Sequence, residues 1–156
     1  RLSVLAGYKR SKAEVLARME QRKQSKPQHK KQDDSYISLT ELARNHSKNT
    51  PGYVIQSWLR SENTLAFLNL WEQENNPDYR EAGYIELLEK KKTASFTLTP
   101  KLWIEKTEAI GIASKQGKGG GTFAHPMIGC EFASWISPEF KMLLLKLSLD
   151  RERLKA

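Results

Sequence analysis

The sequence has one cysteine and no long apolar run, and both shortages exclude a class of protein. Because Cys130 is the single cysteine, the chain forms no internal disulfide and suits a reducing cytoplasm. Apolar runs are at most four residues long, as at 142–145, whereas a helix needs about 20 to cross a bilayer. We therefore expect a cytoplasmic protein that makes no membrane contact. The chain starts at Arg1 rather than at a methionine, so we expect that a segment preceded it.

The chain is equally poor in the side chains that metal sites and catalytic centres use. Its three histidines and Cys130 have no spacing typical of a metal site. We expect the neighbouring acids to be surface pairs, namely Asp33 with Asp34 and Glu72 with Glu74. No set of acid, base and nucleophile indicates catalysis. The sequence therefore predicts neither an enzyme nor a bound metal or cofactor.

Positive charge is unevenly distributed. The net charge is +8, yet residues 32–156 hold 16 basic and 16 acidic residues, so residues 1–31, with ten Lys or Arg and two Glu, carry the whole excess. Val15, Leu16 and Met19 recur at helical spacing before Pro27. We interpret residues 1–34 as a basic, partly helical arm and linker. Such an arm is typical of an electrostatic tether for the phosphate backbone, and a solubilising tail is the alternative.

Residues 35–150 are predicted to form one domain, with a short tail at 151–156. A strand at 36–39 leads into a helix at 41–44, which Ser38 and Glu41 begin with capping-box spacing. Thr50-Pro51 and Thr99-Pro100 are two further helix starts. The other expected elements are a helix at 65–71 after a break at 61–63, a short helix at 84–88, a second strand at 96–98 and a helix at 100–110.

The segment after this last helix is rich in glycine and basic residues. Gly117, Gly119, Gly120 and Gly121 alternate with polar side chains, namely Lys115, Gln116 and Lys118. Residues 112–116 and 121–125 are predicted to pair as a hairpin around this tip. A P-loop is a poor alternative, because five residues rather than four separate Gly111 from Gly117 and Gly119 takes the place of the magnesium-binding Ser or Thr.

The last third of the sequence is predicted to be helical. Four apolar residues lie on one helical stripe, namely Ile128, Phe132, Trp135 and Ile136. Ser137-Pro138 then begins a helix that carries Phe140, Leu143, Leu144 and Leu147, which we expect to be core rather than a dimer seam. A short helix that leads into a basic hairpin is the order of elements in winged helix-turn-helix proteins, which bind double-stranded DNA.

Several segments resemble the KilA-N domain, among them YISLTELA, FTLTPKLWIEKTEAIGI and SKQGKGGGTFAH followed by EFASWISPEF. The resemblance covers about residues 36–147. KilA-N is a small DNA-binding domain of phages, prophages and large DNA viruses, related to the APSES domain of fungal transcription factors. It implies an α+β, winged helix-turn-helix-like fold in which a small sheet and a glycine-rich wing pack on several helices. The resemblance also implies a phage-type regulatory protein in the cytoplasm or nucleoid of a bacterial host. Its binding to double-stranded DNA would be either sequence-specific or structure-tolerant.

The resemblance also assigns parts of the chain. The helix at 100–110 would be the recognition helix, residues 114–122 the wing, and Trp58, Trp71, Phe132, Ala133 and Trp135 core. Pro126-Met127 departs from the family pattern, as does the basic arm.

Charge favours the hairpin over the helix as the DNA contact, because Lys101, Glu105 and Glu108 share one face of the helix and the acids would repel phosphate. The predicted DNA-binding residues are Lys101, Lys106, Ser114, Lys115, Gln116, Gly117, Lys118, Gly119, Gly120 and Thr122. Thr122 is expected either to donate to a phosphate or to end a strand, and His125 to fix the hairpin to the body. The alternative function is that of an antirepressor-like module that binds another regulator. The possible protein partners are therefore such a regulator or a second copy of the chain in a homodimer.

Overall fold

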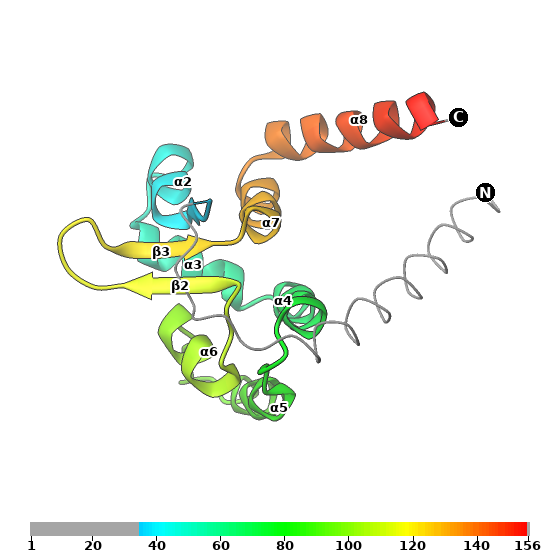
Figure 1. Cartoon of the computed structure of the whole chain (residues 1–156). Helices are drawn as coiled ribbons and strands as arrows, with labels where there is room; N and C mark the ends of the chain where they lie inside the picture. The colour runs from blue at the N-terminus through cyan, green and yellow to red at the C-terminus, as the bar shows by residue number, and fades with distance from the viewer. Residues whose placement is uncertain (1–34, 156) are drawn as a thin grey trace.

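The computed structural model describes residues 35–155 and has an α+β fold of seven helices and three strands in that range (Figure 1). In chain order the elements are β1 (Ile37–Ser38), α2 (Leu39–His46), α3 (Pro51–Leu59), α4 (Glu62–Asn75), α5 (Glu81–Lys90), α6 (Pro100–Thr107), β2 (Ile112–Lys115), β3 (Gly121–Ala124), α7 (Pro126–Ile136) and α8 (Pro138–Lys155). The predicted fold class is confirmed. The predicted arm at 1–34 lies outside the described residues.

The helices at Leu39, Pro51 and Pro100 begin at the predicted caps, and Ser38 and Thr99, but not Thr50, cap them with a side-chain hydrogen bond. Ser38 Oγ accepts a hydrogen bond from the Glu41 N–H at 3.1 Å and so caps α2. Thr99 Oγ1 accepts from the Leu102 N–H at 3.2 Å at the start of α6, where proline takes the first helical position. These caps satisfy backbone donors that a helix leaves unpaired in its first turn.

The sheet is three-stranded and antiparallel, with the strand order β1-β3-β2. Ile112 pairs with Ala124 and Lys115 with Gly121, so the predicted hairpin is confirmed. The predicted strand at 96–98 is wrong, because this segment is a loop. Phe96 and Leu98 face the core from that loop, and their alternation with Thr97 reflects burial without pairing to a neighbouring strand.

The core fills the space between the sheet and the helices. Trp58, Trp103 and Phe132 are fully buried, and the rings of Trp58 and Phe132 meet edge to face at 5.0 Å. The prediction that Trp135 belongs to the core is wrong, because 45% of this residue is exposed. It stacks on Phe132 from the outside, with the ring centroids 6.3 Å apart.

The last helix, α8, also departs from the prediction that its leucines are core. It packs against α7 near its start and then extends away from the body (Figure 1). Leu143 and Leu147 are 53% and 57% exposed, because no other element of the described chain covers them. The helix continues to Lys155. None of the helices in the described range has the length and apolar character needed to cross a membrane.

Candidate nucleic-acid interface

A two-stranded hairpin, residues 112–124, extends beyond the flanking helices α2 and α6 (Figure 1), and we call it the wing. Its turn depends on glycine, because Gly117 and Gly119 have φ angles of +87° and +74°, which L side chains rarely adopt. The Gly120 N–H closes the turn by donating to the Gly117 carbonyl at 3.0 Å. The tip is therefore a tight turn in which glycines leave the backbone N–H groups uncovered beside Gln116 and Lys118.

The wing carries two lysines and no acid. Lys115 and Lys118 are exposed, as are Ser114 and Gln116 beside them. Neither lysine forms an ion pair with any residue in the range that the structure describes, and Lys115 Nζ lies 5.6 Å from the centre of the Phe123 ring. A glycine turn with two accessible ammonium groups and bare amides suits a polyanion.

Thr122 differs from the other predicted wing residues in being buried. It is the second residue of β3, opposite Ser114, so it does not end the strand, and only 8% of the residue is exposed. Its N–H donates to Thr40 Oγ1 in α2 at 2.9 Å, which ties the wing to that helix. Sequence reasoning missed Thr40, because the two residues are 82 positions apart and nothing local marks the pair.

The helix α6 is shorter than predicted and offers one accessible lysine of the two expected. It ends at Thr107 because Glu108 turns left-handed, with φ of +53°, three residues before the predicted end. Lys101 is exposed and makes no ion pair within the described part of the chain. Lys106 Nζ instead lies 3.0 Å from Glu86 Oε1 of α5, so this ammonium group points toward α5 and is already paired.

Glu86 connects two lysines across the α5–α6 contact. Lys90 Nζ also approaches the Glu86 carboxylate, at 3.1 Å. The hydrogen bond from Lys106, and to a smaller extent the one from Lys90, lowers the pKa of Glu86 below its ordinary value. The two helices touch closely at Gly83, where a Cβ would lie 1.9 Å from the Lys106 carbonyl oxygen.

The remaining cations of α5 and the turn after it are also engaged. Lys92 pairs with Glu89 at 2.9 Å. Lys91 Nζ donates to the Arg60 carbonyl oxygen, and burial lowers the pKa of Lys91. The ammonium groups of Lys90, Lys91 and Lys92 therefore all have a hydrogen-bond or ion-pair partner, unlike those of Lys101 and the wing lysines in the described range.

The residues between α6 and β2, 108–111, form what we call the wing base, and a buried carboxylate holds it. Glu72 of α4 is 1% exposed, so the prediction of a surface pair with Glu74 is wrong. Its oxygens accept from the N–H groups of Ile110, at 3.0 Å, and Gly111, at 2.6 Å. The pKa of Tyr79 is raised, mainly by burial and secondly by the negative charge of Glu72. The Tyr79 hydroxyl donates to Asn69 Oδ1 at 2.6 Å.

Two more groups fix the wing base from other directions. The Tyr36 hydroxyl donates to the Ile110 carbonyl at 2.6 Å, and the His125 N–H donates to the Gly111 carbonyl at 2.9 Å. The His125 ring also accepts from the Met127 N–H at 3.1 Å and so caps α7, while it packs 4.9 Å from the Trp71 ring. His125 therefore fixes the hairpin to the body, as predicted, through its backbone.

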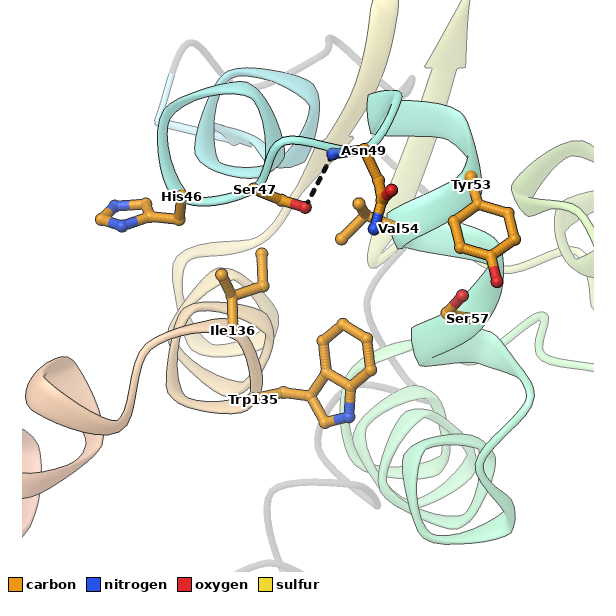
Figure 2. Close-up of a pocket in the computed structure, with 8 residues that line it drawn as sticks. All are labelled: His46, Ser47, Asn49, Tyr53, Val54, Ser57, Trp135 and Ile136. Carbon is orange, nitrogen blue, oxygen red and sulfur yellow. Dashed lines mark hydrogen bonds between the residues drawn. The ribbon is translucent and has the colours of Figure 1, made fainter.

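A shallow pocket of about 230 Å³ lies away from the wing, between α3 and the end of α7 (Figure 2). Trp135 and Tyr53 border it with partly exposed rings, and Ser47 Oγ accepts from the Asn49 N–H at 3.2 Å on its rim. The lining holds no acid–base pair. Within residues 35–155, no three His, Cys, Asp or Glu side chains lie close enough together to hold a metal ion.

Comparison with known proteins places the sequence among DNA-binding domains. The family model of the KilA-N domain matches residues 20–151. "Protein kilA" of Escherichia phage P1 is 41% identical over 58 residues, which cover 35% of this chain and 22% of the phage protein. The chain therefore corresponds to about a fifth of that relative. No solved structure matches the chain.

Proposed function

The chain belongs to the KilA-N domain family, and on this premise we propose that it is a phage-type regulatory protein that binds double-stranded DNA in the cytoplasm or nucleoid of a bacterial host. The family is one of DNA-binding domains rather than of enzymes. The similarity to a phage protein agrees with this role.

The wing is the observation that carries the proposal. It places two unpaired ammonium groups, an exposed amide and an exposed hydroxyl on a glycine turn that contains no acid. Lysine contacts to phosphate supply most of the sequence-independent affinity of DNA-binding proteins. The proposed contacts are Lys115, Lys118, Gln116, Ser114 and the backbone N–H groups of Gly117, Gly119 and Gly120.

The helix α6 has a smaller role in this proposal than the wing. Lys101 at its N-terminal end is the helix residue that we expect to reach phosphate, because it is exposed and has no acidic partner in the described range. Lys106 contributes less, since its ammonium group is held by Glu86. Glu105 on the same helix and Glu108 just after its end are exposed, and both carboxylates would repel a duplex that approached them.

The basic arm, residues 1–34, adds electrostatic affinity in this proposal. It enters the domain through β1, whose Ile37 pairs with Ala124 at the foot of the wing. The ten basic residues of 1–31 are thus attached to the same small sheet as the wing. A tether of this kind increases affinity for any sequence, whereas the wing and α6 contribute to recognition.

The proposal is tested by fluorescence anisotropy of a labelled 20-base-pair duplex titrated with the full chain between 50 and 300 mM salt. We expect log affinity to fall linearly with log salt, with a slope of several units, because basic groups release counterions from phosphate. Selection from a random duplex pool then shows whether one sequence is preferred. Absence of binding at 50 mM salt would contradict the proposal.

Protein binding is the second candidate, and the exposed apolar residues of α8 favour it. Met142, Leu145 and Leu149 follow helix-seam spacing and are 53–61% exposed. Such a surface is typical of a contact with a second copy or with another regulator. Light scattering of the parent and of Leu145→Lys/Leu149→Lys tests self-association. A parent that stays monomeric at 100 μM would exclude a homodimer and leave a different protein as the partner.

A further inference from the structure

The buried carboxylate of Glu72 is the least expected group in the molecule. It sits on α4, 38 residues before the wing base in sequence, and accepts hydrogen bonds from Ile110 and Gly111. Asn76 Nδ2 donates to its second oxygen at 2.9 Å and also to the Glu108 carbonyl at 2.9 Å. Glu72 and Asn76 together therefore bind the left-handed turn that ends α6 and the last two residues of the wing base.

The wing base is consequently held on every side. At Ile110 the N–H is bound by Glu72 and the carbonyl by Tyr36, and at Gly111 the N–H is bound by Glu72 and the carbonyl by the His125 N–H. These partners come from α4, from the segment before β1 and from the junction of β3 with α7. The direction in which the wing leaves α6 is therefore set by groups outside both elements.

A carboxylate fits this position better than its neutral amide. Several donors converge on Glu72, and a carboxylate accepts at both oxygens. A glutamine would turn an NH₂ group toward Asn76 Nδ2. Asn76 could not reverse its own amide without loss, since its Oδ1 accepts from the Asp78 N–H at 3.1 Å. Burying a charge is costly unless it is fully bonded, and here the carboxylate accepts hydrogen bonds from two backbone N–H groups and one side-chain amide.

We propose that Glu72 is a positioning residue for DNA binding: it fixes the direction of the wing relative to α6, so that the wing lysines and Lys101 reach one duplex together. The proposal rests on the proposed function. Glu72 itself is buried and makes no contact with DNA. Its effect passes through the N–H groups of Ile110 and Gly111 to the wing.

The first test uses the full chain without DNA. Residual dipolar couplings of backbone amides report the orientation of residues 112–124 relative to α6. Glu72→Gln is expected to change the couplings of the wing while those within α6 and α7 still fit the parent structure. Glu74→Gln, an exposed acid on the same helix, is the matched control and should change nothing. Unchanged wing couplings in Glu72→Gln would overturn the proposal whatever happens with DNA.

The second test couples Glu72 to the wing lysines through DNA affinity. Lys115→Ala/Lys118→Ala is measured in the parent and in Glu72→Gln. If Glu72 positions the wing, the fold-loss caused by the lysine substitutions is at least about threefold smaller in the Glu72→Gln background, because sites that are linked through a backbone shift have non-additive effects. Equal fold-losses would show a purely structural role and overturn it. A parent in which the lysine substitutions have no effect would instead contradict the proposed function.

A variant that fails to fold does not end the test. Asn76→Ala keeps the Glu72 carboxylate but removes the amide that orients it, and is a milder change. The same two measurements on Asn76→Ala are expected to show the same direction of effect. If this variant folds and both the wing couplings and the lysine fold-loss match the parent, the positioning role is refuted.

Discussion

Removing the two wing lysines is the most direct perturbation of the proposed DNA contact. In Lys115→Ala/Lys118→Ala the backbone turn should persist, because glycines set its conformation and the substituted side chains point to solvent. The one described interaction lost is the contact of Lys115 with the Phe123 ring. We expect the free energy of unfolding to change by less than about 1 kcal/mol.

The expected change in salt dependence follows from the number of charges removed. Each phosphate neutralised contributes about 0.9 to the slope of log affinity against log salt. Both lysines are exposed and without an ion-pair partner among residues 35–155, so both are available to phosphate. Removing them should reduce the slope by roughly 1.8, so the affinity gap between parent and variant narrows by about tenfold from 50 to 200 mM salt.

The assay is anisotropy of one labelled duplex at four or more salt concentrations. Lys141→Ala/Lys146→Ala is the matched control, because it removes the same charge from exposed positions on α8. If net charge alone governed binding, both variants would lose slope equally. A slope for the wing variant that equals that of the parent, or equals that of the α8 variant, would refute a specific role for the wing.

Three other predictions concern α6, its contact with α5 and the charges around it. Lys101→Gln should weaken DNA binding more than Lys106→Gln, since Glu86 already pairs with Lys106; the reverse order in anisotropy would contradict the assignment. In urea unfolding, Gly83→Ala should lower the free energy of unfolding by about 1–3 kcal/mol, because its Cβ would lie 1.9 Å from the Lys106 carbonyl oxygen. Gly52→Ala is the control. Its Cβ would meet nothing within 4 Å, so this variant should raise the free energy of unfolding by up to about 1 kcal/mol. Because its pKa is lowered, Glu86 stabilises the fold above its ordinary pKa. The stability difference between parent and Glu86→Gln should therefore be constant from about pH 5 to 8 and shrink as the pH falls through the lowered pKa; a difference that grows in acid would be inconsistent with this pairing.

The features predicted correctly from sequence are those encoded by neighbouring residues. Ser38 with Glu41 and Thr99 with Pro100 began helices as expected, and the glycines at 117–121 made the hairpin. The KilA-N resemblance is confirmed by the family match over residues 20–151. Caps and turns depend on hydrogen bonds within about four residues, so the sequence determines them with little help from the rest of the fold.

The errors share a different origin. Apolar spacing identified the face of a helix or loop that is hydrophobic, but not what covers it. Leu98 is buried although it lies in a loop, Trp135 borders a partly exposed pocket, and Leu143 and Leu147 of α8 are exposed. In each case the sequence identifies the apolar side chains, but whether they are buried depends on whether an element distant in sequence packs against them.

The same distinction between local and distant contacts applies to the candidate site. The sequence by itself determined that a basic, acid-free glycine turn follows a short capped helix, because those residues are adjacent. The tertiary structure decided which charges remain available and how the wing is aimed. It paired Lys106 with Glu86, 20 residues away, and brought Glu72 to the wing base 38 residues away. Such contacts depend on how the helices pack in three dimensions. The chemistry of two side chains that are far apart in the sequence does not indicate whether they lie close together in the fold.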